Sequence, residues 1–239
     1  MCWSAEASLA MVGLGGVAAG IAAWRGEPRA IWGTLGYFTL MEALQATGYV
    51  VIDECSSPAN RAVTLASYLH IALQPLVINA FAMAIAPAPV SMALRKWVYG
   101  LSAVASALIL AQLLPLPALG RCVPGDVMCG PVTCLVSGDW HIGWELPLNN
   151  LYGPVESVLG MRLQFPAYIL AVFVLPLVYG CWRFVVFHLC AGPLLAWQLT
   201  SDPAEMPAVW CLFSIGILLI GLSPFIRNRV MGAHRAAAA

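Results

Sequence analysis

The feature that most constrains this chain is a series of long apolar stretches separated by short polar breaks. Hydrophobic residues make up 61% of the sequence and charged residues only 9%, whereas soluble domains carry about 25% charged residues. A helix needs about 20 apolar residues to cross a bilayer. The sequence therefore predicts seven membrane-spanning helices, at residues 5–24, 30–52, 62–86, 96–118, 164–181, 184–199 and 206–226. We expect an all-α integral membrane protein, a single seven-helix bundle over residues 1–235 with a tail at 236–239.

The distribution of Lys and Arg predicts the orientation of this bundle. With seven spans, eight of these residues fall on one side of the membrane and three on the other. Cytoplasmic segments carry an excess of Lys and Arg, so the side with eight is expected to be cytoplasmic. The N-terminus then lies outside and the C-terminus inside. The chain begins without the basic segment of a cleaved signal peptide.

The longest connection, residues 119–163, lies outside in this arrangement. It contains the aromatic and polar run Asp139–Glu145, in which Trp140 and Trp144 are four residues apart. That spacing predicts a short helix at the membrane interface. Two interpretations of the connection remain open: a lid over an outward-facing cavity, or a surface loop that rests on the lipid headgroups.

Five of the eight cysteines fall on the predicted outer side: Cys2, Cys55, Cys122, Cys129 and Cys134. An oxidising exterior favours disulfides, and an odd number leaves one thiol unpaired. We expect one bridge within Cys122, Cys129 and Cys134, and a second between Cys2 and Cys55. The Cys-x6-Cys-x4-Cys spacing of the three matches no standard zinc module, so structural disulfides are favoured over a metal site.

Polar residues recur at helical spacing inside the second and third predicted spans, so each set shares one face of its helix. At 1.5 Å per residue, Glu42, His70 and His188 all lie roughly 12–17 Å below the outer surface. An ionisable residue within a membrane helix marks a functional site by default. We therefore predict one buried polar site between the second, third and sixth spans. Its expected lining is Glu42, Gln45, Tyr49, His70, Gln74, Gln112 and His188.

Several functions fit such a site. The leading hypothesis is that it binds, senses or passes a small ligand, an ion or a proton. The second is a metal- or haem-dependent membrane enzyme or electron carrier, in which His70, His188 and Glu42 hold zinc, iron or copper or the histidines ligate a haem. The third is a structural subunit of a membrane complex, whose polar groups only hydrogen-bond neighbouring helices. Pro75 is expected to kink the third span just below His70.

Several other classes are excluded or disfavoured. The formal net charge is zero and the pI is about 6.9, so there is no electrostatic case for nucleic-acid binding. The sequence lacks Gly-x-Ser-x-Gly, His-Glu-x-x-His, a phosphate loop and a dinucleotide fingerprint. The seventh span has no lysine for a retinal Schiff base, and no histidine of the kind found in seven-helix zinc hydrolases. Whether the chain is an enzyme stays open.

Three stretches carry a resemblance to known families. These are the opening Met-Cys-Trp-Ser-Ala-Glu-Ala-Ser, the run Tyr68-Leu-His-Ile-Ala-Leu-Gln-Pro75 and the run Pro207-Ala-Val-Trp-Cys-Leu-Phe-Ser214. In them the chain resembles uncharacterised bacterial membrane-protein families that begin Met-Cys-aromatic-Ser-Ala, and the likeness extends over most of its length. The resemblance implies a bacterial inner membrane, in which the orientation predicted from Lys and Arg makes the N-terminus periplasmic. It carries over no catalytic residue.

Overall fold

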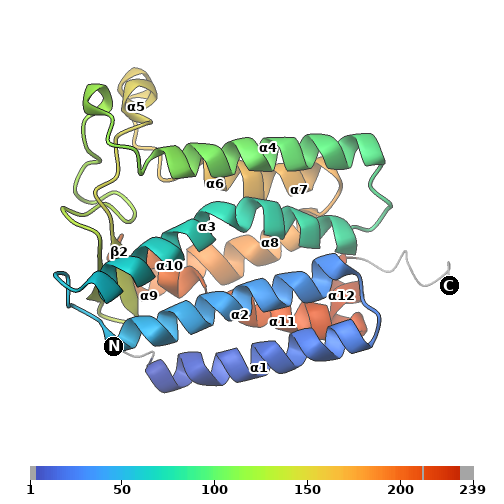
Figure 1. Cartoon of the computed structure of the whole chain (residues 1–239). Coiled ribbons are helices and arrows are strands. Elements are labelled where there is room, and N and C mark those ends of the chain that lie inside the picture. The colour runs from blue at the N-terminus through green and yellow to red at the C-terminus, as the bar shows by residue number, and fades with distance from the viewer. Residues whose placement is uncertain (1–3, 212, 232–239) are drawn as a thin grey trace.

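The computed structural model describes residues 4–211 and 213–231, and this part of the chain is mostly helical. Four long helices come first: α1 (Ala5–Trp24), α2 (Arg29–Val50), α3 (Pro58–Ile85) and α4 (Met92–Ala111). They run side by side, each antiparallel to the one before it (Figure 1). Short connections between successive helices lead to this arrangement. The helices occupy the apolar runs that predicted them.

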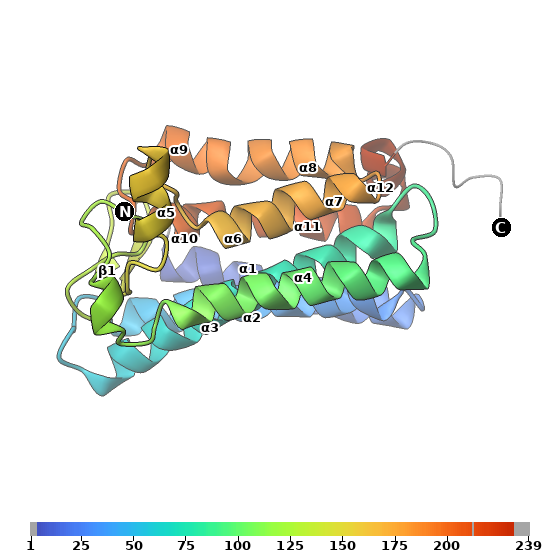
Figure 2. The ribbon, with the colours of Figure 1, turned by 90° about the horizontal axis from the view of Figure 1, so that it is seen from above.

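The second half of the chain is built from shorter helices. Two continuous helical stretches come first: α6 (Pro166–Ile169), η2 (Leu170–Val174) and α7 (Leu175–Val178), then α8 (Trp182–Leu189), η3 (Cys190–Leu194) and α9 (Leu195–Leu199). The last helices are α10 (Met206–Trp210), α11 (Phe213–Leu222) and α12 (Pro224–Met231). Figure 2 shows these helices running alongside the first four.

Prolines shape three helical stretches of the chain. Both η2 and η3 are π-helical turns; Pro193 lies inside η3, and Pro176 follows η2 closely. Proline has no N–H and its ring displaces the carbonyl four residues earlier, so a wider turn accommodates it. Pro75 lies inside α3, which changes direction along its length (Figure 1), as expected of a helix with an internal proline.

Three helices of the described part, α1, α3 and α4, are long and apolar enough to cross a membrane by length and composition. Shorter apolar helical stretches cover Pro166–Val178 and Met206–Leu222. The predicted end of the fourth span at residue 118 is wrong, because α4 ends at Ala111. There the side-chain amide of Asn149 donates to the carbonyls of Ala111 and Leu114 and so caps the helix.

Asn79 joins α3 to the second half of the chain. Its Nδ2 donates to the carbonyl of Pro75 in its own helix at 2.8 Å and to the carbonyl of Ala171 at 2.9 Å. Its Oδ1 accepts a hydrogen bond of 2.7 Å from the hydroxyl of Tyr179. The amide is fully buried, and an unpaired buried amide is costly. These bonds therefore fix α3 against the helices that follow the long connection.

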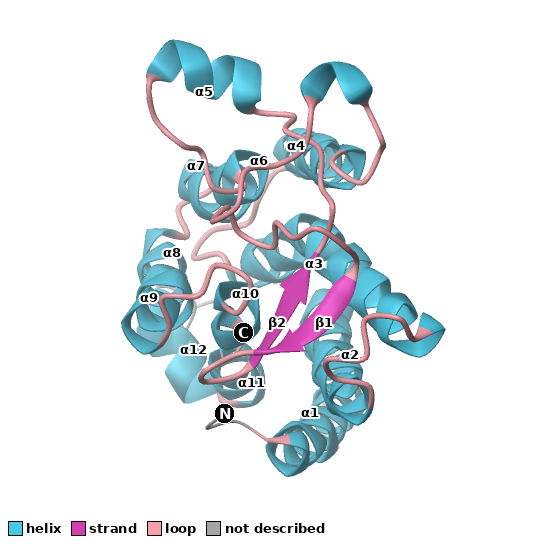
Figure 3. Ribbon diagram, turned by 90° about the vertical axis from the view of Figure 1, so that its left-hand side faces the viewer, coloured by secondary structure: helices cyan, strands magenta, loops and turns pink. Residues whose placement is uncertain are grey.

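Residues 112–165, which we call the cap, gather at one end of the helices (Figures 1 and 3). The cap contains the short helices η1 (Pro117–Leu119) and α5 (Gly153–Leu159) and a hairpin of β1 (Cys134–Ser137) and β2 (Ile142–Glu145). The strands are antiparallel, with Leu135 opposite Trp144. The expectation of an all-α chain thus needs correcting, since a small sheet is present.

The predicted interfacial helix around Trp140 and Trp144 is also wrong. Trp144 belongs to β2 and is fully buried, whereas Trp140 lies in the turn of the hairpin. Asn60 holds the hairpin against the start of α3, since its amide donates to and accepts from the backbone of Leu135. These contacts are between residues far apart in the sequence, so the spacing of two tryptophans could not reveal them.

Candidate functional site

An apolar cavity of about 210 Å³ lies beneath the cap. Its walls come from α2, α3, the segment that starts α6, and α8 to α10, while Val127 and Met128 of the cap close one side. Most of the lining is aliphatic or aromatic, and its polar members include Gln74 and His188. A mainly apolar cavity with a few fixed polar groups is the usual form of a small-molecule site.

His188 lies among aromatic rings at one side of this cavity. Its Nε2 accepts a hydrogen bond of 3.1 Å from the indole N–H of Trp210. The ring of Phe173 lies 4.7 Å from the imidazole, centroid to centroid, and 5.8 Å from the indole. Because the indole can only donate, this Nε2 carries no proton and His188 is held in a defined orientation.

Gln74 is fixed by a second aromatic residue. The hydroxyl of Tyr168 donates to its Oε1 at 2.5 Å, and the ring of Tyr168 packs edge-on against Trp210 with centroids 5.4 Å apart. Gln74 and His188 are therefore linked through Tyr168 and Trp210. Both tyrosine and tryptophan combine a large apolar surface with one hydrogen-bond donor, which suits them to such a lining.

The π-helical turn η3 brings the backbone close to the indole of Trp210. Gly192 lies in η3, and a Cβ at this position would come within 2.3 Å of Nε1 of Trp210. Only glycine therefore allows the indole to lie so close to the backbone. π-helical turns are often found at functional sites, and here η2 contributes Phe173 while η3 contributes Pro193 to the same region.

The cap is fastened to the helices on two sides. The disulfide Cys55–Cys134 links the turn before α3 to β1, and Cys122–Cys129 closes a loop within the cap. On the other side, the buried carboxylate of Glu205 accepts hydrogen bonds from the backbone of Trp140 and from Thr200, the latter at 2.6 Å. The cap is thus a fixed cover over one end of the cavity.

The cysteine pairs test the sequence-based expectation. The bridge Cys122–Cys129 falls within the predicted trio, which confirms one bridge there. The predicted pair Cys2–Cys55 is wrong, because Cys55 is bonded to Cys134; Cys2 itself lies outside the described residues. The hydrogen bonds of Asn60 to Leu135 bring β1 next to the start of α3, and this places Cys134 beside Cys55.

The predicted polar residues do not form one site. Glu42 lines a separate small cavity, where the hydroxyl of Ser214 donates to its Oε1 at 3.2 Å. Phe38 lines both this small cavity and the apolar one. His70 pairs instead with Tyr37, through two hydrogen bonds to backbone carbonyls and stacked rings 3.8 Å apart.

The remaining predicted residues also lie elsewhere. Gln45 is fully buried, and within the described part of the chain no hydrogen-bond partner of its amide is found. The hydroxyl of Tyr49 lies 3.1 Å from Nδ1 of His141 in the cap. Gln112 lines a small polar cavity at the end of α4. Of the seven predicted residues, Gln74 and His188 therefore line the apolar cavity.

The expected metal set of His70, His188 and Glu42 needs correcting. No group of three His, Cys, Asp or Glu side chains among the described residues is placed to hold a metal ion. Each of the three side chains instead has its own protein partner: Tyr37 for His70, Trp210 for His188 and Ser214 for Glu42. Equal depth in three helices did not bring them together, because their side chains point to different neighbours.

His141 is a buried histidine that the sequence analysis did not include in the site. It lies in the hairpin turn, where Nδ1 accepts a hydrogen bond of 2.7 Å from the N–H of Ile142. Burial lowers the pKa of His141 to about 3, because the charged form would lose its hydration. It is therefore neutral at physiological pH, which agrees with an Nδ1 that accepts.

The residues that sequence reasoning missed are mainly aromatic. Tyr168, Phe173 and Trp210 surround the polar members of the cavity, but aromatic residues are common in apolar helices and give no special signal. Met128 comes from the cap, in a segment without a periodic pattern. The prolines in the helical stretches after residue 166 were the one sequence feature that pointed to this part of the cavity.

Fold and cavity together define a mostly helical protein with helices able to cross a membrane and an apolar site beneath a disulfide-bonded cap. The chain belongs to the family described as "Family of unknown function (DUF5765)", which matches residues 6–231. The runs 68–75 and 207–214 lie within the matched range, and the opening Met-Cys-Trp-Ser-Ala precedes it. Neither the curated proteins nor the solved structures gave a match.

Proposed function

We propose that this chain is a membrane protein that crosses the bilayer seven times and binds a small, mostly apolar molecule in the cavity beneath the cap. We assign the proposed crossings to the helical segments 5–24, 29–50, 58–85, 92–111, 166–178 and 182–199, and to the stretch that contains α10 and α11. Large apolar side chains lie exposed along these segments, for example Leu9, Leu101 and Trp197. Extensive exposed apolar surface of this kind supports contact with lipid.

Charge and disulfides support an outward-facing cap. One disulfide lies within the cap and the other joins the cap to the turn before α3, and disulfides persist in oxidising compartments. The turns α1–α2 and α3–α4 lie at the opposite end of the helices (Figure 1), and they or the helix starts beside them carry Arg25, Arg29, Arg95 and Lys96. Excess positive charge favours the cytoplasmic side. A bacterial inner membrane, with the N-terminus in the periplasm, fits this orientation.

The observation that carries the binding proposal is the cavity itself. A cavity of about 150 Å³ lined by apolar side chains binds benzene in another protein, and the cavity here is larger, about 210 Å³. Two of its polar groups, Gln74 and His188, are held in place by aromatic partners. Fixed polar groups in an apolar lining select the orientation of a ligand. We therefore propose an aromatic or aliphatic ligand with one hydroxyl or carbonyl group.

A cavity-filling substitution tests this function. Ala196 is buried and lines the cavity, so Ala196→Phe places a phenyl ring in the binding space. Ala103 is exposed on α4, and Ala103→Phe is the matched control. The probe is 4-bromophenol, added to the purified protein in mild detergent and followed by quenching of tryptophan fluorescence, since Trp210 lines the cavity.

We expect saturable quenching in the wild type and in Ala103→Phe, and only the linear quenching caused by micelle partitioning in Ala196→Phe. A thermal shift measured on the same samples should follow the same order. Identical quenching curves for all three proteins would refute ligand binding in this cavity.

A further inference from the structure

A polar cavity lies at the end of α4, within the cap. Its volume is about 20 Å³, which is room for one water molecule or one ion. Val127, Gln164 and Phe165 line this polar cavity and the apolar one alike, so the two are neighbours. Its polar lining includes Gln112, Asp126, Asn149 and Glu156.

Asn149 has its amide orientation fixed by the end of α4. Its Nδ2 donates to the carbonyl of Ala111 at 2.7 Å and to that of Leu114 at 2.9 Å. Its backbone N–H donates to the carbonyl of Gln112 at 2.8 Å. Because Nδ2 is engaged, Oδ1 remains as an acceptor, and it has no hydrogen-bond partner among the described residues. Asn149 is only 4% exposed.

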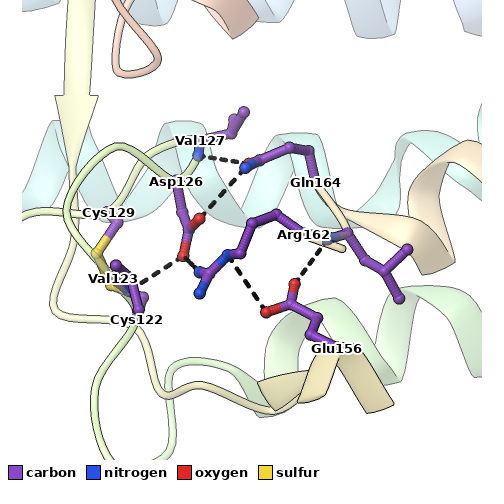
Figure 4. Close-up of polar contacts among 9 residues, drawn as sticks. Cys122, Val123, Asp126, Val127, Cys129, Glu156, Arg162 and Gln164 are labelled. Atoms are coloured by element: carbon purple, nitrogen blue, oxygen red, sulfur yellow. Dashed lines mark hydrogen bonds and ion pairs between the residues drawn. A yellow bond between two sulfur atoms is a disulfide. The ribbon is translucent and has the colours of Figure 1, made fainter. Parts of the chain in front are cut away.

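Two further buried oxygens line the same cavity. Oε1 of Gln112 also lacks a hydrogen-bond partner within the described residues, and this side chain is 7% exposed. Glu156 is 8% exposed; its Oε1 accepts from the N–H of Leu163 at 2.7 Å. Its Oε2 has an ion-pair contact of 3.4 Å with Nε of Arg162 (Figure 4). A buried acceptor without a donor is costly. An occupant that is positively charged or donates hydrogen bonds would therefore stabilise this cavity.

The local charge favours a cation. Asp126 and Glu156 each carry a negative charge, and Arg162 contacts both carboxylates (Figure 4). The three together leave one negative charge beside the cavity. The C-terminal end of α4 adds the negative pole of a 20-residue helix. A water molecule would satisfy two of the acceptors, whereas a cation would satisfy them and also balance this charge.

We propose that this polar cavity is a binding site for a hard cation, with Gln112 Oε1, Asn149 Oδ1 and Glu156 Oε2 as ligands. Carboxylate and amide oxygens are the ligands that Ca²⁺ takes in proteins, often with water. The three residues come from the end of α4, the segment after the hairpin, and α5. A bound ion would join these parts of the cap, independently of any ligand in the apolar cavity.

Calcium titration of the full chain tests the proposal. The protein in mild detergent is treated with chelator, dialysed, and titrated with CaCl₂ at constant ionic strength, with NaCl as the second cation. Binding is followed by calorimetry and by the unfolding temperature. Gln112→Leu removes one ligand oxygen, and Gln112→Glu replaces it with a charged one. Gln198→Leu is the matched control, because Gln198 is exposed on α9.

We expect saturable binding and a raised unfolding temperature in the wild type and in Gln198→Leu. Gln112→Leu should bind Ca²⁺ about tenfold more weakly or worse, and Gln112→Glu more tightly. Tighter Ca²⁺ binding by Gln112→Glu would support the cation site even if Gln112→Leu folds poorly. No saturable effect of either cation, or equal binding by all the Gln112 variants, would overturn the proposal and leave a water molecule as the occupant.

Discussion

Replacing Asn60 by alanine should weaken the attachment of the hairpin to the helices. The fully buried Asn60 amide donates to the carbonyls of Val51 and Leu135 at 2.8 and 2.9 Å, and accepts from the N–H of Leu135 at 2.9 Å. Both carbonyls keep another donor, since the N–H of Asp53 reaches Leu135 and that of Glu54 reaches Val51. The N–H of Leu135 would lose its acceptor.

The magnitude follows from these contacts. An orphaned buried N–H costs about 1–3 kcal/mol, and each lost hydrogen bond whose acceptor keeps a partner costs about 0.5–1 kcal/mol. The sum for Asn60→Ala is about 2–5 kcal/mol, or roughly 10 °C in unfolding temperature for a chain of this size. The exposed Asn228 on α12 offers the matched control, Asn228→Ala.

The assay is thermal unfolding of both variants in the same detergent, with the disulfides intact. Asn228→Ala should unfold within about 0.5 kcal/mol of the wild type. If Asn60→Ala unfolded together with this control, the reasoning that the buried amide holds the hairpin to α3 would be refuted.

Two further predictions concern charge and pH. The unfolded chain binds more protons than the folded one at His141, because burial lowers its folded pKa to about 3; stability should therefore fall, by up to about 1.4 kcal/mol per pH unit, as pH drops from about 6 towards 3. The variant His141→Asn keeps an acceptor but does not titrate. Its free energy of unfolding should therefore change with pH with a slope smaller by one proton. An unchanged slope would contradict the assignment of His141 as a buried, neutral imidazole. Arg227 binds the carboxylate of Glu27 with both Nη atoms, at 2.8 and 2.9 Å, and holds the pKa of Glu27 below its usual value. The stability that this pair contributes is present above about pH 4.5 and is lost as pH falls through the lower folded pKa. Arg227→Gln should lower the free energy of unfolding by about 1 kcal/mol at pH 7. Thermal unfolding measures this against the exposed control Arg229→Gln. Equal stability of the two variants would show that the pair contributes nothing.

The helices were predictable because their signal is local. Apolar runs of about 20 residues predicted segments that the structure places close to the expected positions, with α1 at Ala5–Trp24 and α2 at Arg29–Val50. The ends were less predictable. α4 stops at Ala111, where Pro115 has no N–H for the Ala111 carbonyl and the amide of Asn149, 38 residues later, donates to that carbonyl instead; no pattern within the apolar run reports this distant partner.

The site was predictable only in part. Gln74 and His188 were chosen as costly polar groups inside apolar helices, and both line the cavity. Glu42 and His70 were chosen for the same reason but contact Ser214 and Tyr37 instead. An α-helix turns by about 100° per residue, so depth along the axis says little about which neighbour a side chain meets. Rotation and tilt, which packing decides, determine that.

The sequence by itself determined that the chain is mostly helical, where its helices lie, and that some of its cysteines pair, because hydropathy and composition act residue by residue. Only the tertiary structure decided that Cys55 pairs with Cys134, that Trp144 is buried in a hairpin, and that aromatic rings rather than a third ionisable group surround His188. These features depend on contacts between segments distant along the chain. Such contacts form where shape and hydrogen bonding fit in space, which a one-dimensional pattern does not encode.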